Sequence, residues 1–205
     1  MPKFSIIIPA HNSAGFIEKA LRSIREQTYT DYELIVVCDA CTDNTARVTM
    51  NYADRIIQTE HGRDGLARNA GIEASQGEYI LFMDDDDWYL HEYALDEILR
   101  RIYFAPDAQI ICFGFVWRTR GVTGPINNLG GLWPNVWSKC WRRSFIGETR
   151  FGDEYMESDL YFTRRVLDKV TDPKREIYLI DEPLIYYNYM REGSQTELEA
   201  RKHDG

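Results

Sequence analysis

The chain has 205 residues, and its 44% hydrophobic and 28% charged residues are typical of a globular protein and exclude a disordered one. Acidic residues outnumber basic ones by 33 to 24, a formal net charge of -9, which argues against the basic surface that nucleic acids and anionic membranes bind. The length, with no repeat or linker in the sequence, predicts one continuous domain over 1–205.

The sequence also gives expectations about location. Its longest apolar run, Ile110 to Trp117, is much shorter than the ~20 residues of a transmembrane segment. Pro9 interrupts the N-terminal apolar run too early for a signal peptide, so the cysteines are expected to be reduced thiols. These cysteines are Cys38, Cys41, Cys112 and Cys140. We therefore expect a cytoplasmic protein, either free or peripheral at the inner face of the membrane.

The first hundred residues alternate between apolar runs and segments of helical periodicity. Strands are expected at 4–9, 33–38, 55–59 and 79–83, and helices at 16–27 and 65–75, with a short helix capped by Asp43 or Asn44. Fully apolar strands joined by helices are typical of a parallel sheet that helices cover on both faces. The polar residues after Pro9, Cys38 and Met83 would then share one rim at the carboxyl ends of the strands, where ligands bind.

The second half is less regular. A helix is expected over 95–102 and another from about Ser158, with strands at 109–117, 177–180 and 184–189. The glycine-rich segment 119–132 is expected to be a mobile loop.

Four consecutive carboxylates, Asp84 to Asp87, directly follow the expected strand at 79–83. Adjacent carboxylates repel one another, and a hard divalent cation such as Mg²⁺ or Mn²⁺, which prefers oxygen ligands, removes that penalty. The alternative is a solvated acidic turn that caps the helix near His91. Asp39, after the second strand, is by itself typical of a turn residue. Its expected position on the same rim as the four carboxylates favours a role in binding.

A loop-to-helix junction at Gly62–Gly71 could attract phosphate to the helix N-terminus, and Arg68 could reach a base or a phosphate. The familiar phosphate-binding glycine motifs are missing from this segment.

Taken together, these segments resemble the family 2 inverting glycosyltransferases of the GT-A fold. The resemblance in the first half is carried by Ser5–Asn12, Gln27–Thr28, Glu33–Asp39, Ala67–Gly71 and Tyr79–Asp87. In the second half it is carried by Trp137–Lys139, Arg142–Arg143, Phe151, Ser158–Phe162 and Leu184–Tyr189, and it extends to about residue 196. The implied fold is an α/β, Rossmann-like, mostly parallel sheet flanked by helices, in a single domain with a smaller acceptor-binding half.

The resemblance implies roles for residues of the nucleotide-sugar-binding half, about 1–100. Asp39 would accept a hydrogen bond from the N3–H of uracil or thymine, Arg68 would pack beside the base, and Asp84 and Asp85 would contact ribose or sugar. Asp86 would hold Mn²⁺ or Mg²⁺. The nucleotide pocket would be lined by backbone of Pro9, Ala10, His11 and Asn12.

In the acceptor-binding half, about 101–205, Asp159 matches the carboxylate that serves the family as its catalytic base. The family commonly has Glu-Asp at this point, and here Ser158 replaces the Glu, so Glu157 is the reserve candidate. A second departure is Cys38-Asp39-Ala40-Cys41, where Asp-Asp-Gly-Ser is common.

The predicted function is metal-dependent transfer of a sugar, with inversion, from a nucleoside-diphosphate donor such as a UDP-sugar to a hydroxyl of a glycan or other acceptor. The alternatives are a non-catalytic sugar-nucleotide or glycan-binding module, and an aspartyl phosphatase, whose motif needs Thr or Val where Trp88 stands. Tryptophans of the second half could stack on sugars, although core packing is the commoner role.

Overall fold

Strand β1 (Phe4–Ala10) is buried along its whole length and lies inside the parallel part of the sheet. The computed structural model describes residues 1–126, 131–153, 157–189, 191–192, 194 and 197. The parallel part runs in the order β3 (Arg55–Thr59), β2 (Tyr32–Asp39), β1 and β4 (Tyr79–Phe82). These four strands lie where the apolar runs predict them.

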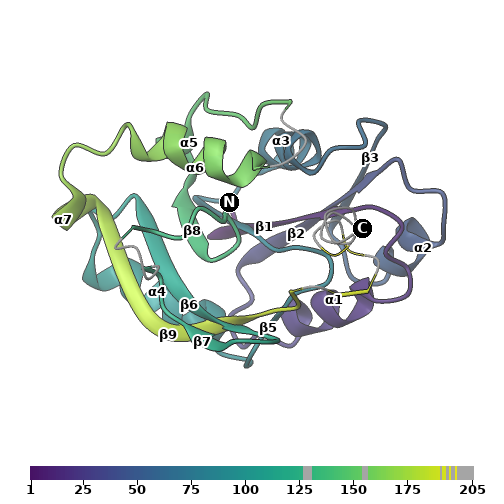
Figure 1. Cartoon of the computed structure of the whole chain (residues 1–205), viewed down its shortest axis with the longest axis horizontal. Helices are drawn as coiled ribbons and strands as arrows, with labels where there is room; N and C mark the ends of the chain where they lie inside the picture. Colours follow the sequence, from purple (N-terminus) through teal and green to yellow (C-terminus); the bar gives the residue numbers. More distant parts are fainter. Residues whose placement is uncertain (127–130, 154–156, 190, 193, 195–196, 198–205) are drawn as a thin grey trace, which may run out of the picture.

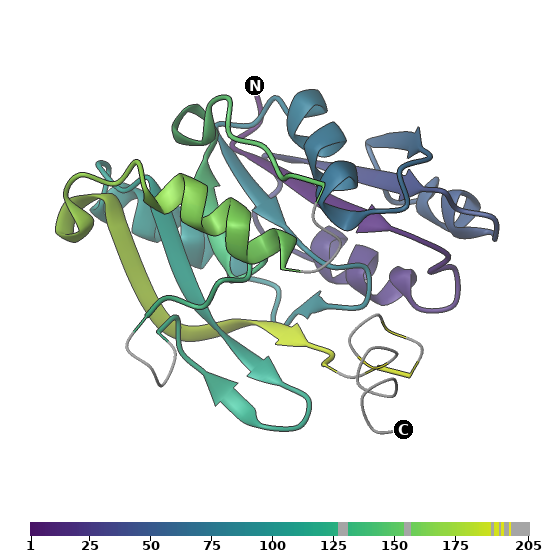
Figure 2. The same ribbon diagram turned by 45° about the horizontal axis from the view of Figure 1, so that its top comes forward.

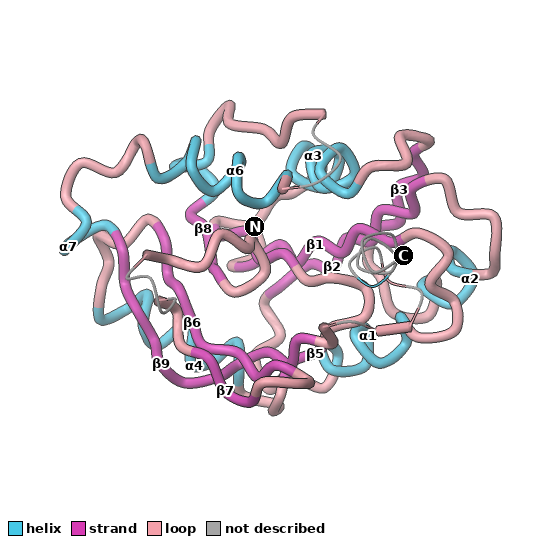
Figure 3. The backbone as a smooth tube through the Cα atoms, viewed as in Figure 1, coloured by secondary structure: helices cyan, strands magenta, loops and turns pink. Residues whose placement is uncertain are grey.

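Helices cover both faces of this sheet, as Figures 1 and 3 show. On one face lie α1 (Ile17–Arg25), α2 (Thr45–Thr49) and α4 (Ala94–Phe104), and on the other α3 (Asp64–Ala74), α5 (Arg143–Ile146) and α6 (Ser158–Leu167). Side chains of β1 alternate between the two layers, Ile6 and Ile8 toward one and Ile7 toward the other. Burying one such side chain contributes about 1.5–3 kcal/mol, so both layers fix the strand.

Local contacts explain how α2 begins and why α3 contains Gly71. Asn44 occupies the N-cap position of α2 without a side-chain hydrogen bond, and the preceding Asp43 accepts from the backbone N–H and hydroxyl of Thr45 in the first turn. Gly71 of α3 lies against β1, where a Cβ would come within 2.3 Å of Ile7 Cγ2. A glycine is therefore required for α3 to pack this closely on the sheet.

Beyond β4 the sheet becomes mixed and curves strongly (Figure 2). It continues through β8 (Lys139–Arg142), β6 (Ile110–Trp117), β9 (Ile177–Tyr187) and β5 (Trp88–Tyr89), while β7 (Gly121–Thr123) pairs with β6. Only the β6–β9 pairing is parallel among these. The helix α7 (Pro173–Glu176) leads into β9.

Two predictions for the second half need correction. The strands expected at 177–180 and 184–189 form one strand, β9, whose pairing with β6 is irregular at Gly114. A Cβ at Gly114 would lie 2.6 Å from the Asp181 carbonyl oxygen. The glycine therefore allows β9, which contains Pro183, to lie close to β6. The segment expected as a loop contains β7, because Gly121–Thr123 folds back on β6; its residues 127–130 lie outside the described ones. None of the helices in the described part of the chain is long and apolar enough to span a membrane.

Candidate active site

Three strand ends meet at the rim that the sequence predicts, and His11 connects them. Its ring Nδ1 lies 2.7 Å from the backbone carbonyl oxygen of Asp39, which ends β2. Its backbone N–H donates to Asp85 Oδ2, just after β4, over 3.4 Å. The residues after β1, β2 and β4 are therefore neighbours, as parallel strands require.

The residues predicted to line the nucleotide pocket lie along this rim. Pro9 and Ala10 are the last residues of β1 and are buried. Asn12 adopts a positive φ of 49°, and its Oδ1 accepts hydrogen bonds from the backbone N–H groups of Thr42 and Asp43. This side chain ties the loop after β1 to the loop after β2.

The Asp39 carboxylate is 3% exposed and organises the loop between β3 and α3. Its Oδ1 accepts from the Thr59 hydroxyl (2.8 Å) and from the His61 backbone N–H (2.7 Å), and its Oδ2 accepts from the Arg63 backbone N–H (2.8 Å). Three donors leave one acceptor position on this carboxylate. Asp39 therefore stabilises a turn, as its position after a strand suggested, and it keeps one free acceptor position.

The four consecutive carboxylates find different partners. Asp84 accepts a hydrogen bond from Arg68 (2.6 Å), Asp86 from Arg191 Nε (2.7 Å), and buried Asp87 from the Asn188 backbone N–H (2.9 Å). Arg191 and Asn188 follow β9, so contacts from the far end of the chain complete this turn.

Burial in this turn disfavours negative charge. It raises the pKa of Asp84 to about 7, although Arg68 opposes the rise, and together with Asp86 it raises the pKa of Asp85 to about 8. Burial and the neighbouring carboxylates also raise the pKa of Asp87 well above its usual range. A bound cation would relieve this accumulation of acidic groups.

These residues fit a metal site of the kind that uses few protein ligands. Within the described ranges, no three His, Cys, Asp or Glu side chains converge on one point. Mg²⁺ is commonly held by one or two carboxylates together with substrate phosphates and water. The Asp86 carboxylate, whose one ion-pair partner among the described residues is Arg191, is suited to that role.

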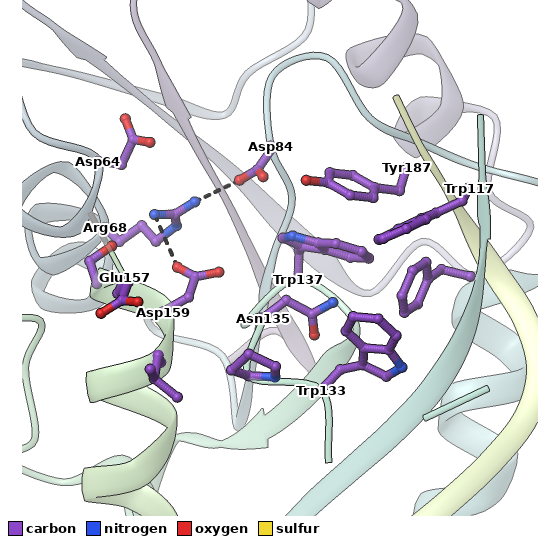
Figure 4. Close-up of a pocket in the computed structure, with 14 residues that line it drawn as sticks. Asp64, Arg68, Asp84, Trp117, Trp133, Asn135, Trp137, Glu157, Asp159 and Tyr187 are labelled. Atoms are coloured by element: carbon purple, nitrogen blue, oxygen red, sulfur yellow. Dashed lines mark hydrogen bonds and ion pairs between the residues drawn. The ribbon is translucent and has the colours of Figure 1, made fainter. Parts of the chain in front are cut away.

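Arg68 lies between Asp84 and Asp159 (Figure 4). Its Nη2 is 2.6 Å from Asp84 Oδ1, its Nη1 is 3.5 Å from Asp159 Oδ1, and the residue is 3% exposed. Burial opposes its charge, but Asp159 and Asp84 raise its pKa above the usual range. The guanidinium, which the resemblance placed beside the base, thus contacts the two carboxylates and lies 5.7 Å from the ring centre of Phe151.

Asp159 is in the first turn of α6, where its Oδ2 accepts a hydrogen bond from the Val136 backbone N–H (3.1 Å). Glu157, the reserve candidate, immediately precedes α6 with a positive φ of 61°. Both carboxylates line the same pocket, so the structure brings both candidates to one place.

This pocket, of about 370 Å³, has a charged side and an aromatic side (Figure 4). The charged side is formed by Asp64, Arg68, Asp84, Glu157 and Asp159. The aromatic side is formed by Phe115, Trp117, Trp133, Trp137 and Tyr187. Sequence reasoning missed Asp64 and the assembly of the aromatic side, although the alternation of Phe115 and Trp117 along one strand face was a usable signal.

Comparisons with known proteins agree with this geometry. The sequence model of the family described as Glycosyl transferase family 2 matches residues 5–143. The poly(ribitol-phosphate) beta-N-acetylglucosaminyltransferase TarS of Staphylococcus aureus (strain Mu50 / ATCC 700699) is 34% identical over 96 residues, which are 43% of this chain and 17% of TarS. The matched segment thus covers less than a fifth of that relative, and the chain as a whole aligns with 37% of the solved TarS chain.

Solved structures share the fold over nearly the whole chain. S. aureus TarS 1–349 in complex with UDP-GlcNAc aligns with a TM-score of 0.80 and 23% identity over 95% of this chain and 60% of that one. The mannosyltransferase PcManGT from Pyrobaculum calidifontis, with GDP-Man and Mn²⁺, has a TM-score of 0.73 and 17% identity over 98% and 61% of the two chains.

Glucosyl-3-phosphoglycerate synthase from Mycobacterium tuberculosis, with Mn²⁺, UDP and phosphoglyceric acid, has a TM-score of 0.69 and 17% identity over 98% and 75%. The family match, the shared fold and the carboxylates gathered at the strand ends lead to one conclusion: the chain belongs to glycosyltransferase family 2 and has the GT-A fold.

Proposed function

We propose that this chain transfers a sugar from a UDP-sugar to a hydroxyl of an acceptor, with inversion at the anomeric carbon. The observation that carries the proposal is Arg68, whose guanidinium contacts both Asp84 of the strand-end rim and Asp159 of the pocket. The donor side and the predicted base are therefore within the span of one side chain.

The donor would bind to the first half of the chain, about 1–100, and the acceptor to the second, about 101–205. Pro9, Ala10, His11 and Asn12 would line the nucleotide pocket, and the remaining acceptor position of Asp39 would receive the N3–H of uracil. Solved relatives of the same fold support such a donor, since TarS is seen with UDP-GlcNAc.

Asp84 and Asp85 would contact the ribose or the sugar, and Arg68 would leave its carboxylates in part as donor groups enter. Asp86 would hold Mn²⁺ or Mg²⁺ in place of its ion pair with Arg191. A divalent cation bound there would supply positive charge beside the departing diphosphate.

Asp159 would act as the base. Its carboxylate takes the proton of the acceptor hydroxyl while that oxygen forms a bond to the anomeric carbon. The bond from the anomeric carbon to the diphosphate oxygen breaks on the opposite side, and its electron pair leaves with UDP. The Val136 N–H, by holding Oδ2, fixes the direction in which the carboxylate faces the pocket.

A thermal-shift panel with Mn²⁺ and UDP, dTDP, GDP or CDP tests the donor part of the proposal. Ligand at 100 times its dissociation constant stabilises by ~2.7 kcal/mol, which for ~200 residues raises the melting temperature by roughly 5–10 °C. We expect this shift with UDP, and a similar one with dTDP, because both bases offer an N3–H. Equal shifts with GDP and CDP would contradict the role of Asp39, and no shift with UDP would contradict the proposed function.

A further inference from the structure

The aromatic side of the pocket is one continuous wall, formed by Phe115, Trp117, Trp133, Trp137 and Tyr187 and called the aromatic wall below. Phe115 is its centre, with ring centroids 4.7 Å from Trp137 and 5.6 Å from Trp133 in edge-on contacts. Trp137 in turn lies 4.5 Å from Tyr187. Phe115 and Trp137 are buried, so the ring surface open to the pocket belongs to the partly exposed Trp117, Trp133 and Tyr187. Such rings at the border of a pocket offer a stacking surface for another apolar face.

A buried lysine fixes the segment that carries two of the tryptophans. Lys139 is 1% exposed, and its Nζ donates to the Trp133 carbonyl oxygen (2.6 Å) and to the carbonyl (2.5 Å) and side-chain (3.0 Å) oxygens of Asn135. Burial lowers the pKa of this ammonium to about 8, although Cys112 and Asp159 oppose the fall. The Thr163 hydroxyl also donates to the Pro134 carbonyl oxygen (2.7 Å).

This fixation means that the wall is formed before a ligand arrives. A preformed surface loses little side-chain freedom on binding, so its contacts translate into affinity more fully than those of a loose one. The same segment donates the Val136 N–H to Asp159, which places the predicted base at the edge of the aromatic wall.

The charges around the pocket select against an anionic ligand. Among its described lining residues, four carboxylates stand against one cation, Arg68, and that cation is already paired with Asp84 and Asp159. A phosphate or carboxylate on the acceptor would therefore be repelled by four carboxylates, whose charge one guanidinium does not offset.

From the wall and the charge balance we infer that the acceptor is an uncharged saccharide, which stacks the C–H face of its terminal ring on the aromatic wall and presents a hydroxyl to Asp159. This inference rests on the proposed function and adds the class of acceptor. Sugar rings fit both features, because one face presents C–H groups to aromatic rings while the hydroxyls at the edge remain free to react.

Calorimetric titration of the protein saturated with UDP and Mn²⁺ tests the inference. The ligands are the methyl glycosides of glucose, galactose, mannose and N-acetylglucosamine, each paired with its 6-phosphate. We expect saturable binding of at least one neutral glycoside and at least tenfold weaker binding of its phosphorylated partner. Equal or tighter binding of a phosphorylated partner would overturn the inference.

Absence of binding by every neutral glycoside, with the UDP-induced thermal shift intact, would also overturn the inference and leave the proposed function standing. Loss of the UDP shift itself would instead count against the proposed function. The two failures are therefore distinguishable.

Two variants locate the binding. Trp133→Leu should lower the affinity for the neutral glycoside about tenfold. The UDP-induced thermal shift should stay unchanged, because the substitution removes a stacking ring and no contact with the donor. Phe104→Leu, at an exposed position at the end of α4, is the matched control and should bind as the wild type does. Asp64→Asn, which removes one negative charge from the pocket, should reduce the difference in affinity between the neutral glycoside and its 6-phosphate. Unchanged affinity in Trp133→Leu would exclude the aromatic wall as the binding surface.

Discussion

The two sides of the pocket are held in place by different kinds of contact. On the charged side, Arg68 bridges Asp84 and Asp159, and Arg191 pairs with Asp86, so side chains hold side chains through ion pairs. On the aromatic side, Lys139 holds backbone carbonyl groups and the rings hold one another. A ligand with a diphosphate or a metal can compete for the first kind of contact but not for the second.

This difference suggests a division of tasks. Buried ion pairs bring little net stability, because desolvation of both partners offsets their attraction, so exchanging them for ligand contacts costs the fold little. Carbonyl contacts with a buried ammonium leave unsatisfied groups when they are lost and are expensive to break. Side chains of the charged side can therefore exchange their ion pairs for contacts with a ligand, whereas the aromatic side keeps one conformation.

Asp86→Ala should produce the largest effect, because it removes the carboxylate that we assign to the metal. We expect transfer to fall below detection and the Mn²⁺-dependent part of the UDP thermal shift to disappear. Asp153→Ala, at a side chain that is 91% exposed, is the control and should change neither. Full wild-type activity in the presence of a chelator would rule out the metal assignment.

Asp159→Asn should lower kcat by ~10²–10⁴-fold, the usual contribution of general-base catalysis. Asparagine is nearly isosteric and its side-chain oxygen can still accept from Val136, but it takes no proton at neutral pH. The UDP thermal shift should remain, because it measures the donor side. Turnover of the donor can be followed with an acceptor or as its slow hydrolysis by water, and near wild-type turnover would contradict the assignment.

The two sides of the pocket also differ in how well the sequence predicts them, and the charged side was predicted better. Carboxylates that directly follow apolar strands, such as Asp39 and Asp84, were placed at one rim because parallel strands share an edge, and His11 confirms this arrangement. The link from Arg68 to Asp159 depends on how α3 and α6 pack, which no local pattern encodes.

The aromatic side was less predictable. Strand β8 has only four residues and begins with Lys139, a residue type that is rarely buried, so no local pattern indicates a strand there. The tryptophans were expected mainly in the core. Trp141 and Trp137 are indeed buried in the core, and Trp117 and Trp133 pack against the core while remaining partly exposed. Trp117, Trp133 and Trp137 also line the pocket.

Lys139→Met tests the aromatic side directly. Three oxygen atoms lose their donor, and relief from burying an ammonium offsets part of that loss, so we expect destabilisation of about 2 kcal/mol. The melting temperature should fall by ~4–8 °C while the shift induced by UDP and Mn²⁺ stays the same size. Lys174→Met, at an exposed position of α7, is the control. A reduced UDP shift would show that the two sides are not independent.

Glu157→Gln should have the smallest effect, a loss of turnover below about tenfold, which corresponds to 1.4 kcal/mol. Both Glu157 and Asp159 line the pocket, but they differ in how they are held. Asp159 is fixed by Val136 on one oxygen and faces Arg68 with the other, whereas Glu157 precedes the helix in a left-handed backbone conformation. A base needs a defined direction toward the hydroxyl, and the fixed carboxylate provides one. Glutamine keeps the length and the backbone preference of glutamate, so the comparison isolates the negative charge. If Glu157→Gln lost as much turnover as Asp159→Asn, each carboxylate would be needed, and if it lost more, the base would lie two residues earlier in the chain.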